Sequence, residues 1–567
     1  MKTLRILLFT TLIGLSLALW IGTTSPARAA RAPQYTYILG GQIRTPQGQA
    51  IEGAHITLYS ESVPKPLGET ESLPDGTWQI GIPSVPEGAM HLHISRAHYQ
   101  ELDISVNRAI VQEWREAGSY QIGEITLERR ITIGFWIGAL IFVGVLLVIA
   151  FEKLHSTTAA LTGASLIFLV SYFGSGWISP DLYIIDFERA LEYINWEVIL
   201  LVMAMMIIIA IIEDTGIFQW LAFQAYRISR GRSWLLALIL MALTAVASAL
   251  LDNFTTMLLM TPISLQIGIA LGINPLALII PEVLASNVGG ISTLVGTPTN
   301  ILIGAYADIG FTDFLSNETV GVVVALIAMG AFVLYHYRDE WRKSSNTLSP
   351  ALYKRLEENA RIEDMQALTR AGIVFILVMV GFIVGEHVGA PPAVPALIGA
   401  SALLIWLKPD VHHMIKAVDW TTLVFFMALF IVVGAVQEIG LISMIAVSMS
   451  NMVGENLPLA TFVVLFGSGT LSVVIANIPL AASMLPVVEF LSGSIPGAQS
   501  KVLYYALSMG AAMGGNGTLI GGEANLVTAG ITSQTDSPIT FKDFVKIGLP
   551  VTYITMLIGY LWLIIRF

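Results

Sequence analysis

The chain has 567 residues, of which 55% are hydrophobic and 12% are charged. Stretches such as VILLVMAMMIIIAII at 198–212 approach membrane-spanning length and have no polar face, which excludes a large soluble domain and predicts a polytopic membrane protein. The net charge of −11 does not indicate a nucleic-acid partner, because the placement of Lys and Arg matters more than their sum in such a protein. The absence of cysteine excludes disulfides, thiol nucleophiles and cysteine metal sites.

Residues 1–30 have the composition of an export signal. Lys2 and Arg5 precede the apolar run ILLFTTLIGLSLALWIG, and the tripeptide ARA that ends at Ala29 fits a small-x-small cleavage site. A signal peptide is therefore predicted, with a retained anchor helix as the alternative. Both interpretations predict that the segment that follows lies outside the cytoplasm.

Residues 31–128 have the composition of a small all-β module. Short alternating segments, including YTYILGGQIRT, AHITLYSES, GTWQIGIPS, MHLHISR and YQIGEITLE, are separated by turn signals such as PDG. His91 and His93 lie on one of these strands and are interpreted as structural rather than metal-binding. The order of the segments resembles the carboxypeptidase-regulatory-like β-sandwich, which implies a module that binds or braces.

Beyond this module the apolar pattern predicts helices. They cover 131–151, 157–173, 196–222, 234–270, 278–308, 318–337, 371–388, 394–407, 420–447, 458–491, 503–531 and 545–566. The segments 234–270 and 458–491 are too long for one crossing and have polar centres, so each is predicted to be a re-entrant hairpin. The predicted fold is an all-α polytopic membrane protein with about ten crossings and two re-entrant hairpins, preceded by the β-sandwich.

The helical part contains an internal duplication. NWEVILLVMAMMIIIAIIEDTGIFQWLA aligns with DWTTLVFFMALFIVVGAVQEIGLISMIA, and SALLDNFTTMLLMTP aligns with SVVIANIPLAASMLP. Further along, GGISTLVGTPTN aligns with GGNGTLIGGEAN. Because these segments recur in the same order with nearly constant spacing, the chain is predicted to contain a first repeat over 131–337, a linker over 338–370 and a second repeat over 371–567.

The distribution of Lys and Arg predicts the orientation of the chain. Most basic residues lie in the segments 227–232, 338–370, 408–416 and 534–546, which are therefore predicted to be cytoplasmic. An odd number of crossings per repeat then inverts the second repeat relative to the first. The β module is expected outside a bacterial-type plasma membrane, and the basic pair at 129–130 goes against the rule.

Each repeat contains a glycine-rich interruption of an apolar helix. Irregular backbone at membrane depth is tolerated only where it is buried in protein or lines a polar cavity, so two such breaks predict a shared site near the midplane. Helix N-termini at the breaks attract anions, and carbonyl, Asn and Thr oxygens suit Na+. Packing of small residues is the alternative; it explains Gly289 and Gly290 but not Asn300 and Asn525.

Carboxylates near the breaks are further candidates. Asp252 lies at the first hairpin tip, where the second repeat has Ala476, and Glu523 lies in the second break, where the first has Pro298. An ionisable group at membrane depth is a functional candidate, so both are interpreted as cation- or proton-coupling groups, with structural caps as the alternative. Glu282, before the first break, is another titratable candidate.

A family resemblance follows from these motifs. SALLDNFTTMLLMTP, NVGGISTLVGTPTN and GGNGTLIGGEANLVTAGI, with YRISRGR and FEKLHSTTAALTGA, resemble the motifs of the ion transporter superfamily. Within its citrate-transporter-like domain family they are most similar to the branch of the melanosomal P protein, arsenite permeases and D-type Na+/H+ antiporters. The resemblance covers 131–567 and implies a scaffold and a transport domain, a homodimer, and a substrate enclosed by the two hairpin tips and the two breaks.

The resemblance also implies the binding residues. Together with Asp252 and Glu523, the expected substrate- and ion-binding residues are Asn253, Thr255, Thr256, Gly290, Thr293, Gly296, Thr297, Pro298, Thr299, Asn300, Asn477, Asn516, Gly517, Thr518, Gly521 and Asn525. Na+ is expected at Asn253, Gly290, Thr293 and Asn300 in the first half and at Asn477, Thr518 and Asn525 in the second. P-protein-like sequences have Asp at the position of Thr297, and the neutral threonine resembles Na+-coupled dicarboxylate and sulfate carriers instead.

The leading hypothesis is a secondary active transporter that moves a small inorganic or carboxylate anion, coupled to Na+ or H+, by elevator-like alternating access. A Na+/H+ antiporter is the alternative. A membrane enzyme or an envelope sensor is a third class, but the sequence shows no nucleophile with its base and no His/Glu/Asp cluster at membrane depth. No catalytic residue is expected, no cofactor apart from the coupling Na+ or H+, and no partner beyond a small ion, the lipid bilayer and a second copy of the chain.

Overall fold

The structure is a computed structural model that describes residues 37–61, 63–86, 88–151, 153–343, 350–362 and 364–567. The predicted signal peptide at 1–30 lies outside these residues. The chain divides into two compact units, Met1–Ile131 and Thr132–Phe567.

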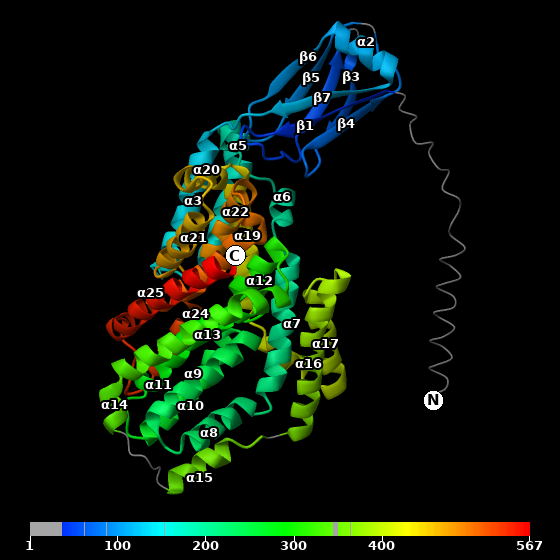
Figure 1. The fold of residues 1–567 in the computed structure, drawn as a ribbon. Helices are drawn as coiled ribbons and strands as arrows, with labels where there is room; N and C mark the ends of the chain where they lie inside the picture. Colours follow the sequence, from blue (N-terminus) through cyan, green and yellow to red (C-terminus); the bar gives the residue numbers. More distant parts are fainter. Residues whose placement is uncertain (1–36, 62, 87, 152, 344–349, 363) are drawn as a thin grey trace, which may run out of the picture. The chain divides into compact units, whose positions relative to one another are not determined.

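The first unit contains two β-sheets (Figure 1). Its elements are β1 (Tyr37–Arg44), β2 (His55–Ser60), β3 (Val63–Glu71), β4 (Thr77–Ile82), β5 (Met90–Ser95), β6 (Leu102–Val106), α2 (Arg108–Ala117) and β7 (Ser119–Thr126). One sheet has the order β4-β1-β7, with β1 antiparallel to β4 and parallel to β7, and the other has the order β3-β2-β5-β6. Trp78, Ile80 and Ile82 of β4 are buried, because a strand directs alternate side chains to the same face.

The strands predicted from alternation are present, whereas β3, β6 and α2 were not predicted. The β3 sequence VPKPLGETE carries two prolines and a glycine, which weaken the strand pattern. His91 stacks on Tyr59 with ring centroids 5.3 Å apart, and His93 Nδ1 lies 2.8 Å from Asp103 Oδ1. Both contacts agree with a structural role for the two histidines.

The second unit is helical, and eight of its described helices are long and apolar enough to cross a membrane. These are α3 (Ile133–Ala150), the continuous stretch of α4 (Ser156–Phe168), η1 (Leu169–Gly174) and α5 (Ser175–Trp177), then α7 (Trp196–Glu213), α9 (Ser233–Leu250), α13 (Phe311–His336), α16 (Met365–Val388), α19 (Trp420–Glu438) and α25 (Phe541–Arg566). The other helices are η2 (Pro180–Leu182), α6 (Phe187–Glu192), α8 (Ile217–Ser229), α10 (Asn253–Ala270), α11 (Leu276–Gly289), η3 (Gly290–Ser292), α12 (Pro298–Ala307), α14 (Arg338–Lys343), α15 (Pro350–Asn359), α17 (Ala393–Leu407), α18 (Val411–Ala417), α20 (Leu441–Val453), α21 (Leu457–Ser472), α22 (Asn477–Ser494), η4 (Ala498–Ser500), α23 (Val502–Gly514), η5 (Gly515–Gly517) and α24 (Glu523–Thr532).

Two predicted helices are wrong as single helices. The segment 196–222 divides into α7 and α8 at Gly216, and the segment 420–447 divides into α19 and α20 at Gly440. The φ angles of these glycines are 78° and 90°, a left-handed conformation that ends a helix and that favours glycine. The apolar pattern continues through both positions, so it did not reveal the turns.

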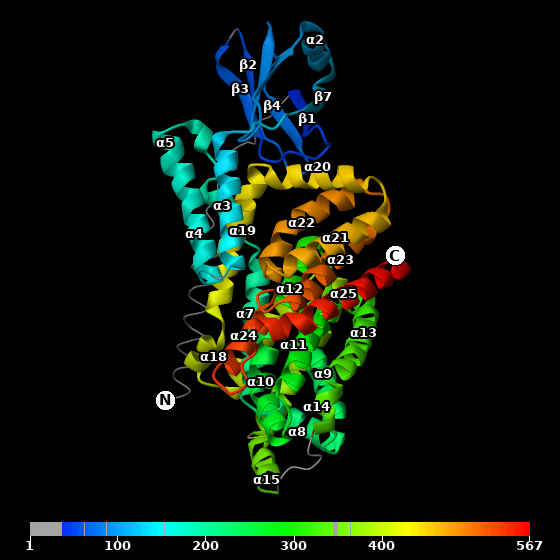
Figure 2. The same cartoon turned by 90° about the vertical axis from the view of Figure 1, so that its left-hand side faces the viewer.

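The other long segments divide at their polar centres. The segment 234–270 forms α9 and α10, and 458–491 forms α21 and α22. The segment 278–308 forms α11, η3 and α12, and 503–531 forms α23, η5 and α24. Consequently the order from α7 to α13 recurs from α19 to α25. Figure 2 shows α11 and α12 in the middle of the helical unit.

Candidate functional site

Two pairs of helices meet at polar turns. Asp252 lies between α9 and α10, and its Oδ1 accepts a hydrogen bond of 2.8 Å from the backbone N–H of Thr255, so that it caps α10. Ala476 holds the corresponding place before α22 and provides no side-chain cap. The first helical residues, Asn253 and Asn477, are 3% and 5% exposed. The first turn of α10 is thus capped by a side chain, whereas that of α22 is not.

The break between α11 and α12 is held closed by one asparagine. Asn300 Nδ2 lies 3.4 Å from the Gly290 carbonyl oxygen and 2.9 Å from that of Thr293. The Thr293 hydroxyl donates to the Ala249 carbonyl near the end of α9. A Cβ at Gly290 would come within 2.6 Å of the Gly296 carbonyl oxygen, so the two sides of the loop approach as closely as only glycine allows.

The break between α23 and α24 has the same construction. Asn525 Nδ2 lies 2.8 Å from the carbonyl oxygens of both Gly515 and Thr518. The Thr518 hydroxyl donates to the Val473 carbonyl after α21 at 2.5 Å. A Cβ at Gly521 would come within 2.7 Å of the Gly515 carbonyl oxygen. In both breaks the asparagine amide nitrogen therefore donates hydrogen bonds to carbonyl oxygens of the same loop.

A chain of amides connects the two breaks. Asn253 Nδ2 donates to Asn287 Oδ1 at 2.9 Å. Asn287 Nδ2 donates to Asn516 Oδ1 at 2.8 Å and to Asn525 Oδ1 at 2.9 Å. Asn287, on α11, was not predicted as a site residue because the repeat alignment pairs it with Ala512. An amide in a fully buried helix was the signal that could have identified it.

A cavity of about 670 Å³ opens beside the second break. Five helices, α4, α10, α19, α22 and α24, present their N-terminal ends to it. The lining residues at these ends include His155, Ser156, Phe254, Asp419, Ala476 and Glu523. A helix N-terminus carries a partial positive charge, so five such ends bring positive potential to one cavity.

A smaller cavity of about 30 Å³ lies among three carboxylates, those of Asp252, Asp419 and Glu523, next to Pro298. Neither cavity has Lys or Arg among its described lining residues. Asp419 was not predicted as a site residue. Its Oδ1 caps α19, just as the aligned Asn195 caps α7, so the sequence indicated only a structural cap.

The other predicted residues are buried. Thr297 caps α12, since its Oγ1 accepts the backbone N–H of the residue three positions along at 3.1 Å. The hydroxyls of Thr256 and Thr299 are buried without a hydrogen-bond partner among the described residues. Glu282 is also fully buried; its Oε2 accepts a 2.9 Å hydrogen bond from Ser264 on α10, and it lines neither cavity.

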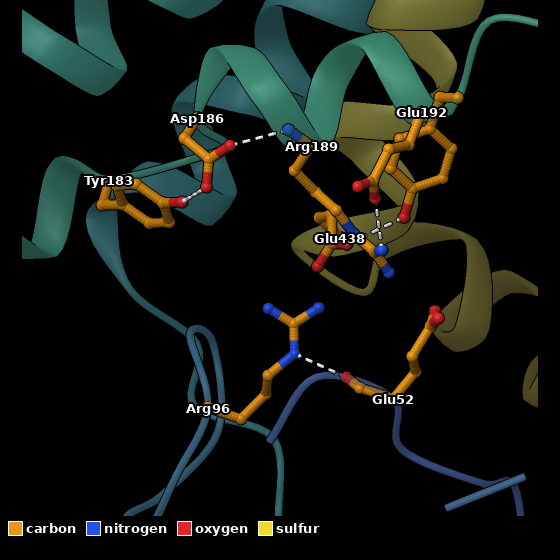
Figure 3. Close-up of polar contacts among 8 residues, drawn as sticks. Glu52, Arg96, Tyr183, Asp186, Arg189, Glu192 and Glu438 are labelled. Atoms are coloured by element: carbon orange, nitrogen blue, oxygen red, sulfur yellow. Dashed lines mark hydrogen bonds and ion pairs between the residues drawn. The ribbon is translucent and has the colours of Figure 1, made fainter. Parts of the chain in front are cut away.

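A separate polar cluster joins α6 to the end of α19 (Figure 3). Arg189 Nε lies 2.9 Å from Glu438 Oε1, and its Nη1 lies 2.6 Å from Glu192 Oε2. The side chains of Arg189 and Glu438 are 28% and 9% exposed, so their ion pair is partly shielded from water. Nearby, the Tyr183 hydroxyl donates to Asp186 at 3.1 Å, and burial, with the charge of Asp186, raises the pKa of Tyr183. This cluster lines neither cavity and fixes α6 against α19.

Comparison with known proteins places this geometry in a family. Residues 146–510 match the profile of the citrate transporter family. A 46 kDa membrane protein of Mycobacterium leprae is 34% identical over 427 residues, which cover 75% of this chain and 97% of that protein. The P protein of Sus scrofa is 30% identical over 570 residues, which cover 85% of this chain and 65% of that protein. The solved YdaH transporter of Alcanivorax borkumensis is 12% identical, with a TM-score of 0.46 over 76% of this chain and 97% of that chain.

The family match confirms the resemblance carried by the motifs. It covers α11 in full and α23 as far as residue 510, together with the helices between them. The protein is therefore an integral membrane protein and a secondary transporter, not an enzyme. The chain belongs to the citrate transporter family of the ion transporter superfamily.

Proposed function

We propose that the protein moves a small inorganic or carboxylate anion, coupled to Na+ or H+. The observation that carries this proposal is the cavity of about 670 Å³ at which five helix N-termini meet. Positive helix ends favour a negative ligand, and the volume falls in the range of roughly 300–1,000 Å³ that is usual for small-molecule sites. Citrate, after which the family is named, is the first anion to test.

The proposed anion position lies against the open helix ends of the second repeat. Asp252 and Thr297 cap α10 and α12, whereas the residues before α22 and α24, Ala476 and Gly522, provide no side-chain cap. Backbone N–H groups in the first turns of α22 and α24, other than at Pro479, which has none, would donate to a carboxylate or another oxyanion. The anion would therefore bind nearer to the second break than to the first.

The carboxylates around the cavity explain why a coupling ion is needed. Asp419 and Glu523 line the same cavity, and in the ionised form both would repel an anion. A proton or Na+ at these groups removes that repulsion, so anion and cation would enter together. Since Asn300 and Asn525 use their amide nitrogens on the loops, the proposed Na+ ligands are oxygens, including the unpartnered hydroxyls of Thr256 and Thr299.

The proposed architecture is that of an elevator-like transporter. In it, α9–α10 and α21–α22 are re-entrant hairpins, and the repeats at 131–337 and 371–567 are inverted around a cytoplasmic linker at 338–370. The recurrence of the same element order in both halves supports this arrangement, and duplicated broken helices are typical of alternating-access transporters. A homodimer with the β module of residues 31–128 outside the cytoplasm completes the proposal.

Uptake into proteoliposomes tests the anion. The purified protein would be offered radiolabelled citrate, succinate, sulfate and phosphate under an inward Na+ gradient or an inward H+ gradient. We expect uptake of at least one of these anions that depends on one of the gradients. No gradient-driven uptake of any anion in the panel would contradict the proposal.

A substitution at Ala476 tests the anion position. Ala476→Asp would give α22 the cap that Asp252 gives α10, and it would add a negative charge beside the cavity. At a separation of about 5 Å and an effective dielectric constant of about 20, the repulsion of a bound anion is about 3 kcal/mol, or about a hundredfold loss of affinity. Ala476→Asn has the same shape without the charge and should retain most uptake; an equal loss in both variants would refute the position.

A Na+/H+ antiporter is the second candidate, and a different observation favours it. Asp252, Asp419 and Glu523 line one cavity of about 30 Å³ that has no Lys or Arg among its described lining residues, which suits a cation. A pH-sensitive dye inside the proteoliposomes separates the two functions. Na+-driven alkalinisation without any added anion, lost in Asp252→Asn, would favour exchange over anion transport.

A further inference from the structure

Glu318 is a buried carboxyl group that the proposed anion site does not use. It lies on α13 and is fully buried, and its Oε2 lies 3.2 Å from Ser508 Oγ on α23. Its other oxygen, Oε1, is buried without a hydrogen-bond partner among the described residues. An ionised carboxylate in such surroundings is strongly disfavoured, whereas a protonated acid is not.

Ser508 connects this carboxyl group to the first break. Its Oγ lies 2.9 Å from Asn300 Oδ1. The orientation of the Asn300 amide is settled by its Nδ2, which lies within 3.4 Å of three loop carbonyls. A serine hydroxyl has one proton to donate, so Ser508 can donate either to Asn300 or to Glu318, but not to both.

The protonation state of Glu318 therefore decides the direction of these hydrogen bonds. When Glu318 carries a proton, it donates to Ser508, and Ser508 donates to Asn300. When Glu318 is ionised, its carboxylate accepts the hydrogen bond from the Ser508 hydroxyl. The buried Asn300 Oδ1 then has no donor. A buried acceptor without a donor weakens the structure around it, so loss of the proton loosens the asparagine that closes the first break.

No hydrogen bond or ion pair among the described residues joins this carboxyl group to a cation, although α25, which packs against α13, carries Lys542, Lys546 and Arg566. Tyr505 of α23 and Arg566 of α25 both contact Asn317, the preceding residue, with Arg566 Nε 3.1 Å from its amide oxygen. Glu386 of α16 accepts a hydrogen bond from the first turn of α13. Within their described sequences α9 and η3 carry no titratable residue, and α11 carries only Glu282. Protonation is thus the available way to neutralise the charge.

The second break contains the titratable Glu523, but no hydrogen bond among the described residues joins a carboxyl group to its closing asparagine. Its Asn525 Oδ1 accepts from the amide of Asn287, which does not titrate. The start of α25, FKDF, aligns with FTDF of α13, and this alignment sets Gly548 opposite Glu318. A Cβ at Gly548 would meet the carbonyl of Asn516, so the second half has no room for a carboxylate there.

We propose that Glu318 is a proton-linked positioning residue that controls, through Ser508, how tightly Asn300 closes the first break. The inference rests on the proposed function in one respect, because Glu318 would bind the proton in the H+-coupled form of that transport. A proton on Glu318 holds the first break closed, and its release frees the loop to move.

Infrared spectroscopy of the full-length protein in detergent tests the proton itself. We expect a carbonyl stretching band of a protonated carboxylic acid at neutral pH that disappears in Glu318→Gln. Ser508→Ala keeps the carboxyl group and should keep a band of this kind. Absence of any band that depends on Glu318 would overturn the proposal.

Hydrogen–deuterium exchange of the same samples tests the positioning. Opening of the peptide at 290–300, corrected for intrinsic exchange rates, should increase about fivefold as the pH rises, which corresponds to one hydrogen bond of about 1 kcal/mol. In Glu318→Gln, whose amide still donates to Ser508, and in Ser508→Ala, the opening should not change with pH. These two variants are the controls, since the peptide at 515–525 contains Glu523, which can respond to pH on its own.

A pH response of the peptide at 290–300 that is the same in the wild type, in Glu318→Gln and in Ser508→Ala would overturn the proposal. Neither measurement needs a transported anion. A failed uptake panel therefore leaves the result for Glu318 standing, and a failed test of Glu318 leaves the anion site standing.

Discussion

Asn525→Ala tests whether an amide holds the second break closed. The substitution removes the donor to the carbonyls of Gly515 and Thr518, both at 2.8 Å, and the acceptor for Asn287 at 2.9 Å. At about 1 kcal/mol for each of these neutral hydrogen bonds, the expected loss of unfolding free energy is about 3 kcal/mol. An unfolding entropy of about 2 cal/mol/K per residue converts this loss into a fall of about 3 °C in melting temperature for a unit of this length.

Thermal unfolding of the purified full-length protein in one detergent measures this change. Asn451→Ala is the matched control, because Asn451 is exposed on α20 and should leave the melting temperature unchanged. Asn300→Ala should resemble Asn525→Ala, since Asn300 makes the equivalent contacts in the first break. If Asn525→Ala has the same melting temperature as the wild type and the control, the amide does not hold the loop closed and the reasoning is refuted.

Three further predictions concern packing, an ion pair and pH. Gly521→Ala places a Cβ within 2.7 Å of two carbonyl oxygens, so the yield of monodisperse protein in size-exclusion chromatography should fall. Gly530→Ala, whose Cβ would have no atom within 4 Å, should not change this yield; equal yields of the two variants would contradict the close approach at Gly521. Arg189→Ala removes the charged hydrogen bond to the largely buried Glu438, which keeps its hydrogen bond from Tyr193, and should cost about 2 kcal/mol in thermal unfolding. Arg342→Ala removes an exposed pair and should cost nothing measurable; equal melting temperatures would show that the pair with Glu438 does not stabilise the fold. Hydrogen bonds from the threonine two positions along hold the pKa of Asp75 below its ordinary 3.8. The charged form therefore stabilises the fold above pH 3.8, and this contribution is lost as the pH falls through the lower pKa of the folded state. Asp75→Asn should be less stable than the wild type at neutral pH and equally stable at low pH; a stability difference that stays constant with pH would argue against this origin.

The positions of the two breaks could be predicted from the sequence, but the use of their residues could not. A single glycine-rich interruption has several explanations, and an aligned copy in the same chain reduces their number. The structure interrupts α11–α12 and α23–α24 at the positions where the two copies align. An amide can donate or accept, and the choice depends on neighbours that are distant in sequence. In the structure the amide nitrogens of Asn300 and Asn525 bind loop carbonyls, and the role of these residues as Na+ ligands stays a prediction.

Asn287 and Ser508 were not predicted from the sequence, because their hydrogen-bond partners lie in the opposite half of the chain. Asn287 and Asn516 are separated by 229 positions, and Ser508 and Asn300 by 208. The repeat search compares equivalent positions, so it does not reveal contacts between positions that have no equivalent. Asp419 was missed for another reason, because an aspartate before a helix is a common cap and its role at the cavities depends on the fold.

The two aligned sequence segments each contain a glycine-rich break, and a few unmatched positions make the two halves chemically different. In the first half Asp252 and Thr297 occupy the helix N-termini, and in the second half these ends are open. An anion should therefore bind with the second half, whereas Glu318 places the proton-linked group with the first. The connection between them is the amide chain through Asn287, which bonds Asn253 on one side and Asn525 on the other. Asn253 belongs to the turn between α9 and α10 and Asn525 to the second break, so this chain joins the two halves through hydrogen bonds. Under the proposed function, we expect coupling of the anion to the cation to arise from the positions at which the two halves differ.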